Sequence, residues 1–116
     1  MPISFSFPQS VRLKTAEDFS IVFKNAKKLN FREFSVYIRT NNLDLPRLGL
    51  AISKKSAKKA VTRNLIKRII RENFRINQDK LVGWDIIFVA KFAAGQSSRQ
   101  ELHAVVQSVC KRLENS

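Results

Sequence analysis

The sequence predicts a single α+β domain in which helices pack against a small mixed sheet. Segments whose apolar residues have helical spacing alternate along the chain with short segments that have a strand pattern. The 116 residues are 44% hydrophobic, which is enough for one core. The expected order is helix, two strands, helix, strand and helix. The domain should span residues 1–116, with residues 1–11 as an extended N-terminal arm because they contain Pro2 and Pro8.

The first predicted helix covers residues 15–26. Thr15 is a suitable N-cap, and Asp18 follows three residues later in a capping-box arrangement. The apolar residues have the spacing of one helix face: Phe19, Val22, Phe23 and Ala26. On this pattern the two phenylalanines belong to the core, unless the helix borders an open face of the sheet.

Two alternating segments are predicted as strands that pair in an antiparallel hairpin. In residues 34–39, one face carries Phe34, Val36 and Ile38, and the other carries Ser35, Tyr37 and Arg39. In residues 48–53, one face carries the small residues Gly49, Ala51 and Ser53. These would form a shallow floor beside Tyr37 and Arg39 that suits a single strand of nucleic acid. The opposite assignment of faces stays open, because a shift of one residue reverses both faces.

The second half of the chain predicts a long helix, a strand and a last helix. Residues 57–76 form the long helix, and general topology rules make the crossover through it right-handed. Residues 84–90 are nearly all apolar, so this strand should be central and covered on both sides. Ser98 and Glu101 form a capping box for the last helix, whose apolar stripe is Leu102, Val105, Val106, Val109 and Leu113.

The net charge points to a polyanionic partner. The chain has 22 Lys and Arg against 9 Asp and Glu, a formal net charge of +13. A membrane is the least supported partner, because no apolar run approaches the roughly 18 to 20 residues needed to cross a bilayer. Residues 1–11 do not have the pattern of a secretory signal. Cys110 is the only cysteine, so we expect no disulfide within the chain and a reducing, cytoplasmic location.

Residues 54–75 concentrate this charge on one predicted helix. They contain nine basic residues and one acid, Glu72, and so hold +8 of the net charge. A stripe at every fourth residue should lie opposite the apolar arc and is flanked by Arg68: Lys59, Arg63, Lys67, Arg71 and Arg75. The apolar arc consists of Val61, Leu65, Ile66, Ile69 and Ile70. Ordinary solvated helix faces mix both signs of charge. This one scarcely does, which favours polyanion binding, and Lys54 and Lys55 extend the basic surface.

The residue types for protein-borne catalysis are missing from the pattern. His103 is the only histidine, which excludes a nuclease that uses two histidines as acid and base. The acids are scattered, without the spacing of a two-metal site. There is no phosphate-binding loop and no dinucleotide fingerprint. We therefore expect no catalytic residue, no metal ligand and no organic cofactor in this chain.

The central basic segment resembles a known family. Residues 60–75, AVTRNLIKRIIRENFR, are similar to the signature helix of bacterial ribonuclease P proteins. The resemblance covers most of residues 12–92 and includes the segments around Phe19, the aromatic strand from Phe34 to Tyr37, and residues 46–55. The family signature usually begins Arg-Asn-Arg, whereas the third residue here is Leu65. This departure affects one expected contact with RNA and leaves the fold unaffected.

The resemblance implies a fold and an activity. The fold is α-β-β-β-α-β-α, like domain 2 of ribosomal protein S5, with an extra strand near residues 28–31. Its βαβ crossover is left-handed, against the general rule. The chain would be the accessory protein subunit of ribonuclease P, an endoribonuclease that removes the 5′ leader of precursor tRNA. The RNA subunit would be the catalyst and would hold the Mg²⁺.

The resemblance and the charge pattern together give two sets of binding residues. The first should bind ribonuclease P RNA: Lys54, Lys55, Lys59, Arg63, Asn64, Lys67, Arg68 and Arg71. The second should bind the leader of precursor tRNA: Phe19, Phe23, Tyr37, Arg39 and Ser53. We expect no membrane contact and no obligate protein partner.

Three other functions remain possible on the sequence. A structural RNA-binding protein, such as a ribosomal protein, would bind RNA without depending on a tRNA leader. A DNA-binding protein would use residues 57–76 as a recognition helix and keep its specificity for duplex DNA at raised salt. A protein-only nuclease would cleave without added RNA.

Overall fold

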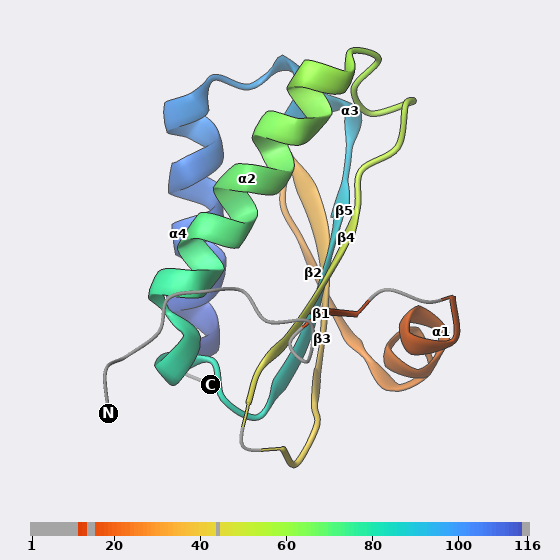
Figure 1. The fold of residues 1–116 in the computed structure, drawn as a ribbon, viewed down its shortest axis with the longest axis vertical. Helices are drawn as coiled ribbons and strands as arrows, with labels where there is room; N and C mark the ends of the chain where they lie inside the picture. The colour runs from red at the N-terminus through yellow and green to blue at the C-terminus, as the bar shows by residue number, and fades with distance from the viewer. Residues whose placement is uncertain (1–11, 14–15, 44, 115–116) are drawn as a thin grey trace.

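The computed structural model describes residues 12–13, 16–43 and 45–114, so the predicted N-terminal arm and the Thr15 cap lie outside the described residues. The predicted α-β-β-β-α-β-α order is confirmed, with three short additions: β1, the 3-10 helix η2 and α3 (Figure 1). In chain order the elements are β1 (Arg12–Leu13), α1 (Ala16–Asn25), β2 (Lys27–Asn30), β3 (Phe34–Thr40), β4 (Arg47–Ala51), α2 (Ala60–Ile76), η2 (Gln78–Lys80), β5 (Trp84–Ala90), α3 (Phe92–Gln96) and α4 (Arg99–Glu114).

The strands form one mixed sheet in the order β1-β4-β5-β3-β2. β5 is central, as predicted, and runs parallel to β4 and antiparallel to β3. The predicted hairpin between residues 34–39 and 48–53 is wrong, because β5 lies between these strands: Ile87 pairs with Tyr37 on one side and with Gly49 on the other. The hairpin partner of β3 is β2, the extra strand that the family resemblance implied. β4 and β5 are joined through α2, and the hand of this crossover stays a prediction.

Helices α2 and α4 lie side by side on one face of the sheet, and α1 lies on the other (Figure 1). The main core forms between the sheet and this helix pair. β3 contributes Phe34, Val36 and Ile38 to it, all at most 5% exposed, which confirms the predicted face. α2 contributes its buried residues Ile66, Ile69, Ile70, Asn73 and Phe74. Both helices bury their apolar faces in this core, so their charged residues lie on the outer faces.

The N-terminal end of α2 differs from the prediction in two ways. The helix begins at Ala60 rather than at residue 57. Val61, predicted to belong to the apolar arc, is 71% exposed. The reason is geometric: Val61 precedes the buried Ile70 by nine residues. At about 3.6 residues per turn this is two and a half turns, so the two side chains point to opposite sides of the helix.

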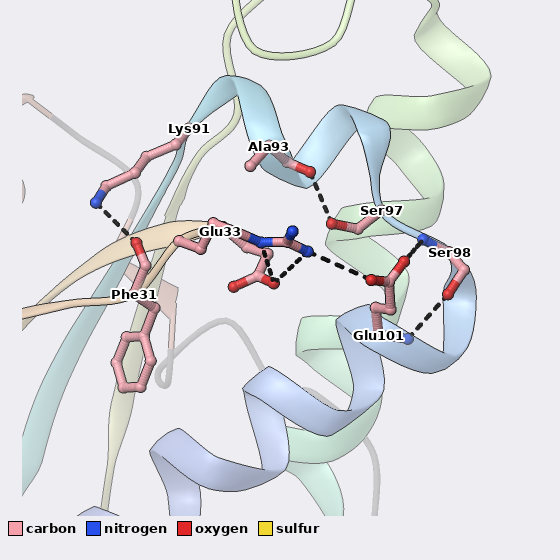
Figure 2. Close-up of polar contacts among 8 residues, drawn as sticks. Phe31, Glu33, Lys91, Ala93, Ser97, Ser98 and Glu101 are labelled. Atoms are coloured by element: carbon pink, nitrogen blue, oxygen red, sulfur yellow. Dashed lines mark hydrogen bonds and ion pairs between the residues drawn. The ribbon is translucent and has the colours of Figure 1, made fainter.

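The capping box predicted for the last helix is present at the start of α4 (Figure 2). The backbone N–H of Ser98 donates to Glu101 Oε1 at 2.8 Å, and the N–H of Glu101 donates to Ser98 Oγ at 3.2 Å. The hydrogen bonds from Ser98 lower the pKa of the Glu101 carboxyl, since they favour its charged form. Arg32 Nη2 lies 3.3 Å from Glu101 Oε2 and so joins the β2–β3 turn to α4.

Candidate nucleic-acid interface

Helix α1 is held on the sheet by a second, smaller core. Its buried residues are Leu13, Val22 and Ile87, which come from β1, α1 and β5. Four partly buried side chains pack around them: Phe19, Ala26, Tyr37 and Val89. Tyr37 therefore lies on the α1 face of the sheet, away from the main core, as the sequence predicted. This places a partly exposed tyrosine directly beside α1.

Three rings form a contiguous group on this face, which we call the aromatic wall: Phe19, Phe23 and Tyr37. The rings of Phe19 and Phe23 are stacked, with centroids 6.1 Å apart, and Tyr37 meets Phe23 edge-on at 4.7 Å. Lys28 Nζ lies 5.8 Å from the centroid of the Tyr37 ring, within cation–π distance. Phe23 is 42% exposed. The wall thus offers solvent an aromatic surface with a cation at its edge.

A groove of about 650 Å³ runs beside the aromatic wall, which we call the aromatic groove. It is lined by Phe19, Ser20, Phe23, Lys24 and Ala51. Ala51 is on the floor, as predicted, but the neighbouring Gly49 is buried beneath Phe19. A Cβ at Gly49 would stand 2.5 Å from Phe19 Cε1, so the missing side chain is what lets this ring lie against the sheet. Ile87 of β5, which the predicted hairpin had omitted, lies between Tyr37 and Gly49 in the sheet and is fully buried.

Arg39 is engaged within the protein rather than free on the floor. Its Nη1 donates to the Ile21 carbonyl of α1 at 3.1 Å, and its Nε lies 3.4 Å from Asp85 Oδ2. Asp85 is fully buried and also accepts two 2.7 Å hydrogen bonds from Arg47 and one of 2.9 Å from Asn41. We call these four side chains the Asp85 cluster. The hydrogen bond to Asp85 raises the pKa of Arg47.

The Asp85 cluster was missed by sequence reasoning, which counted Asp85 among scattered acids. One signal was available: it is an acid inside a strand that is otherwise apolar, and such a carboxylate must find buried donors. The cluster links three strands to α1 through Arg39. A leader-binding role for Arg39 stays a prediction, and the structure gives this residue a second role in holding α1.

Ser53, Lys54 and Lys55 lie on the loop between β4 and α2. All three are exposed. The Ser53 carbonyl accepts hydrogen bonds from Ser56 Oγ at 2.8 Å and from the N–H of Ala57 at 3.1 Å, which fixes the turn. Gly95 of α3 packs so closely on the Ser56 carbonyl that a Cβ there would collide with it. The loop is therefore shaped by its backbone, and both lysines are free to face solvent.

On α2 the cations do not form the straight stripe that was predicted. Residues four apart advance by about 40° around a helix, so such a stripe winds from one side to the other. Arg63, at its start, is half-buried and turns back: its Nη1 donates to the carbonyls of Ala57 at 2.9 Å and Lys58 at 2.7 Å. Lys67 is also half-buried. The exposed residues define what we call the α2 surface: Lys59, Asn64, Arg68 and Arg71.

The structure separates most residues of the two predicted sets, but Ser53 of the leader set lies on the same loop as Lys54 and Lys55. The α2 surface and the aromatic groove belong to opposite faces of the sheet (Figure 1).

Within the described residues, no group of three or more His, Cys, Asp or Glu side chains could hold a metal ion. Burial raises the pKa of the Cys110 thiol to about 11, so it stays protonated at neutral pH. In the same residues, no helix is long and apolar enough to cross a membrane.

Comparisons with known proteins agree with this arrangement. Residues 7–114 match the family model described as ribonuclease P. The chain is 45% identical to the ribonuclease P protein component of Pseudomonas paraeruginosa over 96% of its own length and 83% of that protein. It is 46% identical to that of Ectopseudomonas mendocina, over 98% and 86%.

Two solved structures have the same fold. The RNase P protein of Staphylococcus aureus superposes with a TM-score of 0.81 at 35% identity, covering 88% of this chain and 94% of that one. The RNase P protein of Thermotoga maritima superposes with a TM-score of 0.76 at 31% identity, covering 87% and 96%. Family model, sequence relatives and fold all agree, and the chain belongs to the ribonuclease P protein family.

Proposed function

We propose that this chain is the protein subunit of a ribonuclease P holoenzyme, binding the catalytic RNA through the α2 surface and the 5′ leader of precursor tRNA in the aromatic groove. One observation carries the proposal: the two surfaces lie on opposite faces of one sheet. A domain built in this way can contact two RNA segments at once without either blocking the other.

The aromatic groove suits a single strand. Bases stack on aromatic rings whatever their sequence, and each stack contributes about 1 to 3 kcal/mol. Phe23 and Tyr37 offer partly exposed rings, while Lys24 and Lys28 stand close by to meet phosphates. A leader has no fixed sequence, so recognition by stacking and charge is the appropriate kind. Mature tRNA has no leader and cannot make these contacts, so substrate is favoured over product.

The α2 surface suits a folded RNA. Arg68 and Arg71 are exposed on the outer side of α2, and the loop before the helix adds Lys54 and Lys55. In this proposal, the cations of α2 and the preceding loop neutralise RNA phosphates. This lowers the repulsion between the RNA subunit and the precursor tRNA and so reduces the Mg²⁺ concentration needed for them to associate. The proposal places the Mg²⁺ mainly on the RNA subunit, as the family resemblance implies.

Catalysis is assigned to the RNA. The protein contributes binding energy at the leader and relief of repulsion at the RNA interface, and both act without any protein group touching the scissile bond. A cytoplasmic location is part of this proposal and agrees with a single, buried and unpaired cysteine.

The decisive experiment is cleavage of a precursor tRNA with a 5′ leader at low Mg²⁺. Bacterial ribonuclease P RNA is tested with and without this protein, and the protein is also tested alone. We expect cleavage at the mature 5′ end only when both are present. A protein that adds nothing to the RNA would reduce the assignment to a general RNA-binding module. Cleavage by the protein alone would establish a protein-only nuclease.

The α2 surface is tested by replacing Arg68 and Arg71 with Ala. Binding to ribonuclease P RNA should weaken, and the dependence of log K on log salt should flatten by roughly 0.7 to 0.9 for each phosphate that the protein no longer neutralises. Both side chains are exposed, so the fold should be unaffected. A salt slope equal to that of the wild type would remove these residues from the interface.

The aromatic wall beside the groove is tested by Tyr37→Ala. The loss of one base stack should weaken binding of the leader-bearing substrate by about 1 to 3 kcal/mol. Affinity for the same tRNA without a leader is the control and should not change. An equal loss with both RNAs would show that Tyr37 acts elsewhere.

A further inference from the structure

A second depression lies where α2 meets α4 and encloses about 340 Å³. Both helices begin at the same end of the molecule (Figure 1). The depression is lined by Val61, Thr62, Asn64, Leu65, Arg68 and Arg99. The last of these comes from the first turn of α4, far from the signature helix in sequence. Neither the charge pattern nor the family resemblance pointed to Arg99.

Two of the side chains that line this depression are apolar, although it lies within the most basic region of the chain. Val61 is 71% exposed, and Leu65 is half-buried against the main core. Leu65 also stands where the family signature usually has an arginine. Phosphates alone would make no favourable contact with these two apolar side chains. A ligand that covers Val61 and Leu65 must itself carry an apolar surface.

Two guanidinium groups, those of Arg68 and Arg99, line the depression, and no acid is among its lining residues. Among the described residues, neither Arg68 nor Arg99 forms an ion pair. Glu101, the acid nearest to Arg99 along α4, has its carboxylate turned to the N–H of Ser98 and to Arg32 (Figure 2). The capping box engages the N–H groups of Ser98 and Glu101, and the two guanidinium groups supply the side-chain positive charge that would attract an anion. A guanidinium meets a phosphate through two parallel hydrogen bonds.

We propose that this depression binds one unpaired nucleotide of the RNA subunit, with its phosphate between Arg68 and Arg99 and its base on Val61 and Leu65. The inference rests on the proposed function, because it names how the RNA partner is held. An unpaired nucleotide is required since bases within a duplex are stacked and hide their faces. Arg99 thus supplies from α4 the positive charge that Leu65 no longer supplies from α2.

The experiment measures binding of the full-length chain to ribonuclease P RNA over a range of salt. Arg99→Gln is compared with Lys111→Gln, which removes one exposed cation from the last turn of the same helix. We expect Arg99→Gln to weaken binding roughly tenfold, the usual effect of removing one charged hydrogen bond. Its salt slope should fall by about 0.7 to 0.9. Lys111→Gln should match the wild type in both.

A second variant separates the base contact from the phosphate contact. Val61→Ser keeps every charge and alters an exposed side chain, so the fold should tolerate it. Its affinity should fall while its salt slope stays unchanged, because contact between a base and an apolar side chain releases no counterions. Adding Leu65→Arg to Arg99→Gln should restore the slope, since it returns a cation to the same depression.

Chemical probing of the RNA identifies the nucleotide. With the wild-type protein one unpaired base should become protected, and with Arg99→Gln it should be exposed again. If the wild type binds the RNA but Arg99→Gln behaves like Lys111→Gln, the inference is overturned and the proposed function stands. If the wild type itself fails to bind ribonuclease P RNA, both are overturned.

Discussion

The two faces of the sheet are buried by very different amounts of protein. On one face, α2 and α4 together cover Phe34, Val36, Ile38 and Phe88, and a continuous core extends to the ends of both helices. On the other, the short helix α1 covers a buried core of only Leu13, Val22 and Ile87 among the described residues. The helix pair stabilises the fold, whereas α1 leaves aromatic rings partly exposed for a ligand. Stability and recognition are therefore assigned to opposite faces of the same strands.

The largest expected effect comes from replacing a phenylalanine on each of the two faces of the sheet. Phe74→Ala empties a site in α2 that is 2% exposed and should lower the free energy of unfolding by about 3 to 5 kcal/mol. Phe23→Ala removes the same atoms from a ring that is 42% exposed and should cost less than about 1.5 kcal/mol. Urea denaturation followed by circular dichroism gives both values. Equal losses would show that the α1 face also bears stability.

The Asp85 cluster sharpens the contrast, because its member Arg39 donates a hydrogen bond to the Ile21 carbonyl of α1. Asp85→Asn keeps the shape but removes the charge that Arg39 and Arg47 share, and should cost about 1 to 3 kcal/mol of stability. Arg39 also donates a hydrogen bond to the Ile21 carbonyl of α1, so the same substitution should lower the affinity for the leader. Asp79→Asn, at an exposed acid in η2, should change stability by less than about 0.5 kcal/mol. A stable Asp85→Asn protein with normal leader binding would contradict this link.

The smallest expected effect is at the start of α4. Ser98→Ala should cost about 1 kcal/mol by removing the N-cap, while Ser108→Ala, later in the same helix, should stay within about 0.5 kcal/mol. Glu101 adds a pH dependence. The pKa of Glu101 is lowered in the folded state. Its contribution to the free energy of unfolding is therefore present above its ordinary pKa and is lost as pH falls through the lowered pKa. Thermal unfolding of Glu101→Gln should therefore differ from wild type at neutral pH and converge with it in acid.

The elements and faces of the fold could be predicted, but the neighbours within the sheet could not. Alternation placed Phe34 and Tyr37 on the correct faces, because a period of two reports which side a residue is on. It carries no information about which strand lies alongside. Proximity in sequence favoured a hairpin between β3 and β4, but β5, from the far end of the chain, pairs with both. That choice depends on the whole core rather than on any local segment.

The candidate site was predictable to a similar degree. Sequence named the aromatic residues and the basic helix, since both follow from residue type and spacing. It could not show that Arg63 and Arg39 are committed to backbone carbonyls within the protein, because such contacts depend on the path of loops and on helix docking. Nor could it bring Arg99 beside Arg68, because they lie in different helices.

The fit of Phe19 over Gly49 has a consequence for how this protein can change over evolution. Any side chain added at position 49 would meet the ring, so a lineage that acquires one must first give up the large residue at 19. Each substitution alone would be selected against: a side chain at position 49 would clash with the ring, and loss of Phe19 would remove an aromatic surface. Positions 19 and 49 should consequently vary as a pair among homologous chains, with glycine retained wherever the phenylalanine is.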